Sequence, residues 1–299
     1  MVKGGSGVFK RIAADKWFDF INMTIITIWL IIIIYPLYFV VIASFTDPTA
    51  LQQSWFWPKE INFEGYKLII QSDTLWTGYK NSFIYLILGT TINVLLTLPA
   101  AYALSRKDLN GRNALMLFVT FTMFFSGGLI PTYLTVKALN MVDTIWAMII
   151  PNAVGAWNLI IARTFFQQTI PDELLDSAKI DGCSDIRFFL HIAIPISKAL
   201  VAVMILFYGV GHWNAFLNAL IYLRSDELYP LQLVLRNILI RNQISTDMIM
   251  DLSSLGDQVR AGELIKYGVI IMGALPMLVL YPFLQKYFVQ GLLIGSIKG

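Results

Sequence analysis

The sequence contains very little cysteine, histidine or charge. Its 299 residues include one cysteine, Cys183, which excludes an internal disulfide and a thiolate metal cage. Two histidines leave little scope for a histidine metal site, so no metal is expected on this chain. Charged residues make up 14 % of the chain, whereas ordinary soluble domains carry about 25 %. The 22 basic and 19 acidic residues nearly balance, which argues against a nucleic-acid partner.

Charge is absent altogether from six stretches of 19 to 27 residues, in a chain that is 57 % apolar. A bilayer core about 30 Å thick needs roughly 20 apolar residues of helix, whose backbone amides must pair within the segment. Buried helices of a soluble protein would need polar faces, and runs such as residues 29–34 lack the alternation of barrel strands. The sequence predicts an all-α membrane protein, a single domain of residues 1–299, with six transmembrane helices at residues 20–46, 81–105, 113–136, 144–162, 199–223 and 267–285.

The basic residues predict how these helices are oriented. Lys3, Lys10, Arg11 and Lys16 precede the first stretch, which favours a cytoplasmic N-terminus. That stretch is longer than a signal-peptide core of about 7–15 residues, so we expect a retained helix in the lipid bilayer. Alternating the sides puts 13 of the 22 basic residues on the N-terminal side, and both termini are therefore predicted to be cytoplasmic.

The loop at residues 169–198, between the fourth and fifth predicted spans, has the pattern of a structured element. Thr169 is a candidate N-cap and Pro171 a candidate first-turn residue, and Asp172 and Glu173 would complement the positive end of a helix dipole. Gly182 is placed where a left-handed cap would end that helix. A second helix is predicted from Ser184 and Asp185 to Pro195.

The first of these helices carries Leu174, Leu175 and Ala178 on adjoining faces. Such an apolar surface must pack against something. One interpretation is that it packs against the protein's own helices, and the other is that the helix inserts into a cleft on a cytoplasmic partner.

The spacing of this loop resembles the signature of the inner-membrane permeases of ATP-binding-cassette (ABC) importers, E-A-A-x3-G-x9-I-x-L-P. Here Asp176-Ser177-Ala178 is followed at the same spacing by Gly182, Ile192 and Pro195, with Ile194 in place of leucine. Other segments resemble the carbohydrate-uptake permeases within that family, namely the maltose-type second permease and the LplC/YtcP-like group. These segments are residues 125–133, 213–214, 229–232 and 285–299.

The resemblance implies a type I ABC-importer permease fold and a transport subunit, not an enzyme, in the bacterial inner membrane. It implies four kinds of partner: a homologous second permease, two cytoplasmic ATP-binding subunits, an extracellular solute-binding protein and the bilayer. No cofactor would lie on this chain, since ATP and magnesium would be held by the ATPases. The loop helix would be the coupling helix of an alternating-access importer of oligosaccharides. Its ATPase-coupling residues would be Glu173, Leu174, Leu175, Asp176, Ser177, Ala178, Asp181, Gly182 and Pro195.

Other transport and enzyme classes lack support in the residues. The sequence has no G-x4-G-K-[ST] phosphate loop, so this chain is not the ATPase. An ion-coupled secondary carrier usually needs a charged group within its spans, and the six stretches contain no Asp, Glu, Lys or Arg. His212, near Gly209 and Gly211, fits a hydrogen-bonding packing residue better than a proton relay. A permease for another solute class stays open.

The predicted spans offer uncharged polar and aromatic side chains that suit sugar hydroxyls and sugar faces. A stripe of Thr90, Asn93 and Thr97 lies on the second span, and Asn214, Asn218 and Tyr222 on the fifth. The predicted substrate pathway comprises Asn93, Asn152, Asn158, Trp213, Asn214 and Asn218. The alternative, favoured for most of them, is that they hydrogen-bond between helices, each contributing roughly 1 kcal/mol.

Glycine and proline interrupt the third predicted span towards its outer end. Discontinuous backbone at membrane depth is tolerated only within protein or beside a cavity. Gly127, Gly128 and Pro131 are therefore candidates for an outer gate, with close helix packing at small residues as an equally weighted alternative.

Overall fold

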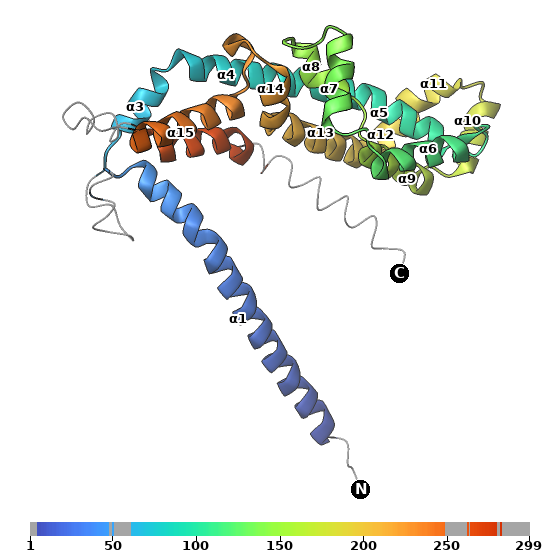
Figure 1. Cartoon of the computed structure of the whole chain (residues 1–299). Helices are drawn as coiled ribbons and strands as arrows, with labels where there is room; N and C mark the ends of the chain where they lie inside the picture. The colour runs from blue at the N-terminus through green and yellow to red at the C-terminus, as the bar shows by residue number, and fades with distance from the viewer. Residues whose placement is uncertain are drawn as a thin grey trace. The chain divides into compact units, whose positions relative to one another are not determined.

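The protein is described by a computed structural model that places the backbone of residues 5–47, 50, 61–248, 262, 264–279 and 282, with side chains placed from residue 16 and, before residue 262, up to 240. Within these ranges all regular structure is helical and no strand occurs (Figure 1), which confirms the predicted all-α class. Contacts divide the chain into two compact units, Met1–Ile69 with Asn242–Met272 and Ile70–Arg241 with Gly273–Gly299. The single domain of residues 1–299 stays a prediction.

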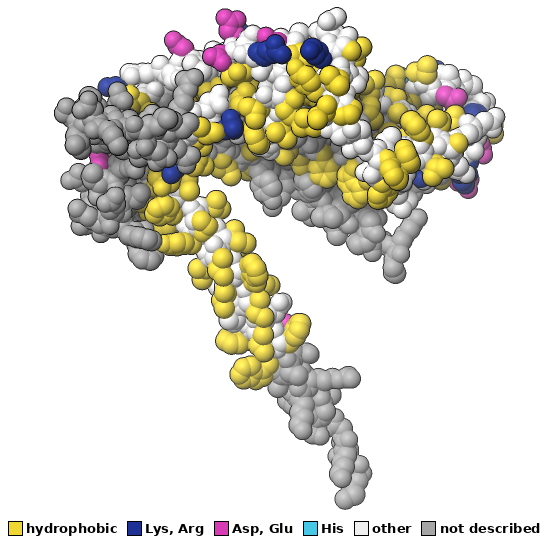
Figure 2. Space-filling view, in the orientation of Figure 1, with side chains coloured by type: hydrophobic (Ala, Val, Ile, Leu, Met, Phe, Trp, Pro, Cys, Tyr) yellow, Lys and Arg dark blue, Asp and Glu magenta, His cyan; other side chains and the backbone are white. Residues whose placement is uncertain are grey.

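The first unit is dominated by the long helix α1, Gly5–Ser44. Its segment Lys16–Ser44 contains an 18-residue stretch with a mean hydropathy of 2.7 and is long enough to cross a membrane. Hydrophobic side chains cover its visible face (Figure 2), as expected of a helix surrounded by lipid. At its end the Phe45 ring stacks on Tyr66 of α3, Glu64–Ile70, and the Tyr66 hydroxyl donates to Ser44 Oγ at 2.9 Å.

The second unit contains most of the remaining helices, several of which are short or interrupted. The α-helices are α4 Asp73–Ile84, α5 Thr90–Ser105, α6 Arg112–Phe124, α7 Leu129–Ala138, α8 Ile145–Ile149, α9 Ala156–Thr169, α10 Asp172–Ile180, α11 Asp185–Phe188, α12 Ile194–Ile196, α13 Lys198–Trp213 and α14 Phe216–Tyr222. Two further helices, α15 Leu231–Met248 and Leu264–Val279, have residues in both units.

The second predicted span is one long helix with a local widening. Helices α4 and α5 are joined by the π-helical turn Tyr85–Gly89 into the continuous segment Asp73–Ser105, which contains an 18-residue stretch with a mean hydropathy of 1.8. A Cβ atom on Gly89 would overlap the His212 ring, so glycine permits the close approach of α13 at this turn.

The third and fourth predicted spans are broken helices. Helices α6 and α7 meet at 114° around residues 125–128, where Gly128 has φ +83 in the region that favours glycine. Helix α8 and the 3-10 turn Ile150–Asn152 meet α9 at 49°, and Pro151 explains the break because it lacks an amide hydrogen. Helix α9 also continues beyond residue 162 to Thr169.

The fifth predicted span is interrupted as well, which the sequence analysis did not anticipate. Helix α13 ends at Trp213 and α14 begins at Phe216, so Asn214 and Asn218 do not share one continuous helix as predicted. The sixth predicted span corresponds to Leu264–Val279, and its last residues lie outside the described part of the chain. Among the residues that the structure describes, two helices are long and apolar enough to cross a membrane, or up to five if each bent pair is one span, so the count of six stays a prediction.

The core of the second unit lies where α5, α9 and α13 meet the loop helices. Its fully buried side chains include Phe166 of α9, Phe188 of α11 and Met204 of α13. Tyr102 of α5 packs edge-on against Phe166 and stacks on Phe188, with ring centroids 5.8 Å and 6.3 Å away. The core therefore joins α5 to both α9 and α11.

Candidate functional site

Helix α10 is the nine-residue helix that the sequence pattern predicts in loop 169–198. Pro171 is its N-cap rather than a first-turn residue, and Thr169 lies in the preceding helix and does not cap. The helix ends in a Schellman motif: the Cys183 amide donates to the Ala178 carbonyl and the Gly182 amide to Lys179. Gly182 has φ +74, which confirms the predicted left-handed stop.

The apolar face of α10 packs against the protein's own core. Ala178 is buried, and Leu174 and Leu175 pack beside it on the core that contains Phe166 and Phe188. This packing agrees with the first interpretation, in which the apolar face of the helix packs against the protein's own helices. The contact of Leu174, Leu175 and Ala178 with an ATPase stays a prediction. The exposed predicted coupling residues are Glu173, Asp176, Ser177, Asp181, Gly182 and Pro195. Ile180, which the sequence analysis did not select, is 86 % exposed beside them.

The second loop helix begins at Asp185 and continues through a π-helical turn, Phe189–Ala193, to Ile196. Ser184 caps it by accepting the Arg187 amide at 3.4 Å, which confirms the predicted start. Asp185 leads its first turn, where a carboxylate is favoured by the helix dipole.

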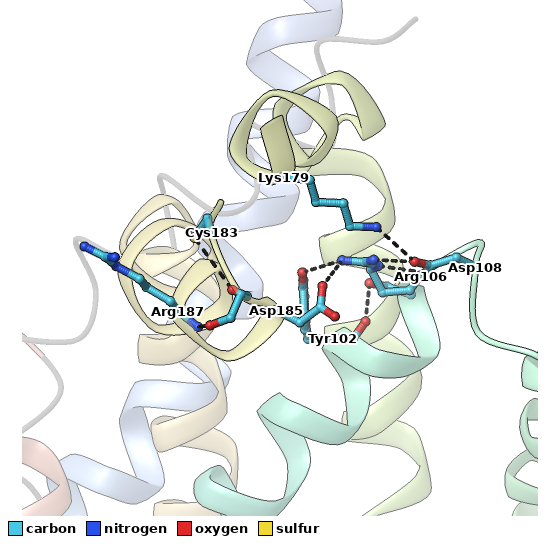
Figure 3. Close-up of polar contacts among 9 residues, drawn as sticks. Tyr102, Arg106, Asp108, Lys179, Cys183, Asp185 and Arg187 are labelled. Atoms are coloured by element: carbon cyan, nitrogen blue, oxygen red, sulfur yellow. Dashed lines mark hydrogen bonds and ion pairs between the residues drawn. The ribbon is translucent and has the colours of Figure 1, made fainter. Parts of the chain in front are cut away.

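An ionic cluster of Arg106, Asp108, Lys179 and Asp185 joins the end of α5 to both loop helices (Figure 3). Arg106 Nε and Nη2 donate to the two carboxylate oxygens of Asp108 at 2.9 Å and 2.5 Å. Its Nη1 donates to the Tyr102 hydroxyl at 3.0 Å and to Asp185 at 3.2 Å. Lys179 of α10 donates to Asp108 at 3.4 Å.

The charges of this cluster stabilise one another. The hydrogen bond from Arg106 holds the pKa of Asp108 well below its usual range, and the same bond raises the pKa of Arg106. Both groups therefore stay ionised throughout the physiological range. Neither residue was among the predicted site residues, although a short loop with three basic residues and one acidic residue between two spans is a detectable signal.

The backbone carbonyls that end α5 are also paired with side chains. Arg163 of α9 donates to the Leu104 carbonyl, and Arg112 donates to the Arg106 carbonyl, both at 3.2 Å. Gln167 of α9 donates to Ser105 at 3.4 Å. Cations at the carboxyl end of a helix complement its dipole, so the end of α5 is anchored to α9.

A second polar network lies inside the helices, at the break of the fourth span. Asn93 is fully buried, and its Nδ2 donates to the Asn152 and Ala153 carbonyls at 2.8 Å each. Two carbonyl partners fix the amide orientation, so Asn93 Oδ1 accepts from His212 Nε2 at 2.6 Å. Asn93 therefore holds the broken backbone in place rather than facing a pathway, and His212 is the hydrogen-bonding residue that the sequence favoured.

Tyr208 completes this network from α13. Its hydroxyl accepts the Gly155 amide at 3.1 Å and shares a hydrogen bond of 2.7 Å with Thr97. The polar groups that the break exposes are thus paired with α5 and α13, as burial requires. Thr90 Oγ1 is buried without a hydrogen-bond partner within the described residues.

The other predicted pathway residues lie in different environments. Trp213 is fully buried beside Tyr79 and Phe83, and its Nε1 donates to the Gly273 carbonyl at 3.2 Å. The structure therefore uses Trp213 for packing instead of exposing it. Asn152 and Asn214 are exposed, and Asn158 and Asn218 are half-buried.

The candidate gate residues lie at the sharp bend between α6 and α7. Gly127 and Gly128 form the break, and Pro131 lies within the first turn of α7. Tyr133 of α7 stacks on Tyr222 of α14, with ring centroids 6.2 Å apart and planes 3° from parallel. The break therefore leads into a helix that contacts the end of α14.

Asp143 ties the loop before α8 to the segment that follows α14, a role that sequence reasoning missed. Its carboxylate accepts the Arg224 and Ser225 amides at 2.8 Å and 2.9 Å, and the Ser225 hydroxyl at 2.6 Å. These hydrogen bonds, first the one from the Ser225 side chain, lower the pKa of Asp143. Asp143 has φ +62, a conformation that aspartate adopts more readily than most residues.

The lowered pKa predicts acid sensitivity at this junction. A depressed folded-state pKa gives stability that is present above the unfolded value of about 4 and lost as the pH falls through the folded value. Wild type should unfold at a higher temperature than Asp143→Asn at pH 6, and this difference should shrink towards pH 3. Thermal unfolding monitored by circular dichroism measures it.

A matched variant keeps the carboxylate and removes one donor. Ser225→Ala should retain the acid dependence but shift it to higher pH, because one stabilising bond to the charged form is lost. A difference between wild type and Asp143→Asn that is constant from pH 6 to pH 3 would contradict the assignment.

Residues 74–294 match the family described as "Binding-protein-dependent transport system inner membrane component". The chain belongs to this family. It is therefore a permease subunit of an ABC importer, not an enzyme, and its apolar helices agree with an inner-membrane protein.

The permease is similar over nearly its whole length to two proteins of Bacillus subtilis (strain 168). It is 41 % identical to "Protein LplC" over 288 residues, which are 96 % of each chain. It is 39 % identical to the "Polygalacturonan/rhamnogalacturonan transport system permease protein YtcP", covering 95 % of this chain and 99 % of that one.

Its fold is also found in a solved transporter. A chain in the crystal structure of a bacterial ABC transporter involved in the import of the acidic polysaccharide alginate superposes with a TM-score of 0.83. The two chains are 27 % identical, and the match covers 92 % of this chain and 98 % of the other. The helical arrangement is therefore the ABC-importer permease fold.

Proposed function

We propose that this permease imports oligosaccharides and is driven by the two ATP-binding subunits of the importer. Their force would reach this chain through α10. The observation that carries the proposal is the two-sided construction of that helix. Leu174, Leu175 and Ala178 anchor α10 to the permease, while Glu173 and Asp176 lie on an exposed side with Ile180. An apolar side chain that is 86 % exposed at the end of an otherwise anchored helix suits a surface covered by another subunit.

The complete importer would contain this permease, a homologous second permease, two ATPases that hold ATP and magnesium, and a solute-binding protein. In this arrangement the chain crosses the bilayer six times, with both termini and α10 on the ATPase side. ATP-driven closure of the ATPases would move α10 and rock the helices between inward-open and outward-open states. The Gly127–Gly128 break before α7, with Pro131, is proposed to flex as an outer gate.

The proposed substrates are oligosaccharides that contain uronate units, by analogy with the names of two similar transporters. Asn152, Asn158, Asn214 and Asn218 are the proposed contacts with sugar hydroxyls, because their side chains are exposed or half-buried. The six charge-free stretches contain no Lys or Arg to pair with a carboxylate. This observation favours a second candidate, neutral oligosaccharides, unless the second permease supplies the cations.

Uptake by the reconstituted importer distinguishes the two candidates. Vesicles containing both permeases, the ATPases and the binding protein should take up labelled galacturonan oligosaccharides when ATP is supplied on the ATPase side. Arabinan and galactan oligosaccharides are the matched neutral probes. Uptake of the neutral probes alone would select the second candidate, and absence of ATP-driven uptake of either class would contradict an oligosaccharide importer.

A further inference from the structure

The ionic cluster at the end of α5 joins parts of the chain that are far apart in sequence. Arg106 follows α5, whereas Lys179 ends α10 and Asp185 begins α11. Helix α10 is covalently continuous with α9 through Ile170 and Pro171 alone, and it has no such connection to α5. Any displacement of α10 reaches α5 through side-chain contacts.

Arg106 is placed at the centre of these contacts. Its side chain is 12 % exposed. Its guanidinium donates one hydrogen bond to Tyr102, two to Asp108 and one to Asp185 (Figure 3). Four directed hydrogen bonds from one planar guanidinium fix the orientation of the partner side chains in addition to neutralising their charge. A lysine ammonium would supply the charge without fixing the orientation. Asp108 is in turn shared with Lys179, so α10 and α11 are both tied to the same residue pair.

Shielding of the cation distinguishes this cluster from a neighbouring ion pair: Arg106 is 12 % exposed, although its partners Asp108 and Asp185 are 56 % and 68 % exposed. Lys107, the next residue, bonds Asp172 of α10 at 2.5 Å, but its side chain is 74 % exposed and Asp172 is 56 % exposed. Exposed ion pairs contribute little because water and salt screen them. Arg106 is mostly shielded and lies 5.9 Å above the Tyr102 ring, whose face packs against the loop helix.

The surroundings argue against a ligand site at Arg106. A cavity of about 570 Å³ opens beside the cluster, lined by Pro99, Ala103, Ile186 and Phe189 among others. Arg106 and two carboxylates form its polar end, but the guanidinium is already engaged by both carboxylates. An incoming anion would have to displace Asp108 or Asp185.

We propose that Arg106 is a positioning residue that makes α5, α10 and α11 move as one body, with Asp108, Lys179 and Asp185 as its partners. The inference rests on the proposed drive through α10. Without Arg106 the apolar core still joins α5 to the loop helices, but part of their displacement is absorbed at residues 169–171 and 181–184 before it reaches α5. More ATP is then hydrolysed for each movement of the transport helices.

The test uses the reconstituted importer and measures galacturonan or neutral oligosaccharide taken up per ATP hydrolysed. Arg106→Gln should lower this ratio about tenfold while ATP hydrolysis continues, within the usual range of coupling between sites. The uptake per ATP hydrolysed should also be clearly lower in Arg106→Lys than in wild type, since charge alone does not replace the directed hydrogen bonds. Lys107→Gln is the matched control: it removes an adjacent charge paired with α10 and should keep the wild-type ratio.

A second readout needs no substrate. Spin labels at position 95 of α5 and position 187 of α11 replace Leu95 and Arg187, whose side chains are exposed, in a Cys183→Ser background. In the complete importer the label distance should stay narrow with and without ATP and vanadate. In Arg106→Gln, and to a smaller extent in Asp185→Asn, it should broaden. The double variant should be no worse than Arg106→Gln alone, because both changes remove the same interaction.

Each outcome decides the proposal. A wild-type ratio and a narrow label distance in Arg106→Gln would overturn it, as would an equal loss in Lys107→Gln. If Arg106→Gln does not assemble, Asp185→Asn replaces it in both measurements. A wild-type uptake per ATP hydrolysed and a narrow label distance in Asp185→Asn would then overturn the proposal. Failure of wild type to couple ATP to any probe would contradict the proposed function, while a broadened distance in Arg106→Gln would still support the positioning role.

Discussion

Replacing Asn93 by leucine should lower the unfolding temperature of the permease by about 5–10 °C. Leucine has a similar size, but it leaves the Asn152 and Ala153 carbonyls and the His212 ring nitrogen without partners. Each unpaired buried group costs about 1–3 kcal/mol, reduced where water or lipid headgroups reach it. A loss of about 1 kcal/mol shifts the midpoint by about 2–4 °C in a chain of 150–250 residues.

The measurement is thermal unfolding of the purified permease in detergent, followed by circular dichroism. Asn218→Leu makes the same chemical change on a half-buried side chain of α14 and should shift the midpoint by less than about 2 °C. Equal shifts in the two variants would show that Asn93 does not hold the break of the fourth span.

Gly182→Asp should leave the permease assembled in the membrane but disconnect ATP hydrolysis from uptake. A Cβ at residue 182 would meet nothing within 4 Å, so the core that anchors α10 is undisturbed. The backbone, however, has φ +74, which costs a non-glycine residue about 1 kcal/mol or more. An aspartate there also puts negative charge at the carboxyl end of α10, where the helix dipole disfavours it.

Both effects act on the Schellman motif that ends α10. Uptake per ATP hydrolysed should fall about tenfold or more, measured in vesicles that contain all subunits. Gly182→Asn is the matched control, because asparagine tolerates the left-handed conformation best among residues with side chains and carries no charge. The logarithm of uptake per ATP hydrolysed should fall less than half as far in Gly182→Asn as in Gly182→Asp. Normal uptake by Gly182→Asp would contradict the coupling role of α10.

Local patterns identified the elements of the loop because their chemistry is local. A helix stop at Gly182 depends on one residue that adopts positive φ at little cost, and Ser184 caps the next helix through an amide three residues away. The charge-free stretches likewise indicated membrane helices, since the exclusion of charge from hydrocarbon acts on each residue separately.

The breaks within those stretches were anticipated only where glycine marks them. Gly127 and Gly128 predicted the interruption before α7, whereas the ends of α8 and α13 were not expected. A polar helix break is stable inside the bundle only when other helices supply partners, as Asn93 and Tyr208 do for the fourth span. Nothing near Asn152 in the sequence indicates which helix will supply them.

The amino-acid order alone settled that this chain is a helical membrane protein with a capped helix in loop 169–198, because hydropathy and capping depend on neighbouring residues. The three-dimensional packing decided which face of α10 is buried and which charges meet it. Arg106 and Asp185 are 79 residues apart, and Asn93 and His212 are 119 apart. Contacts at such separations depend on how whole helices pack, so residue types along the chain do not reveal them.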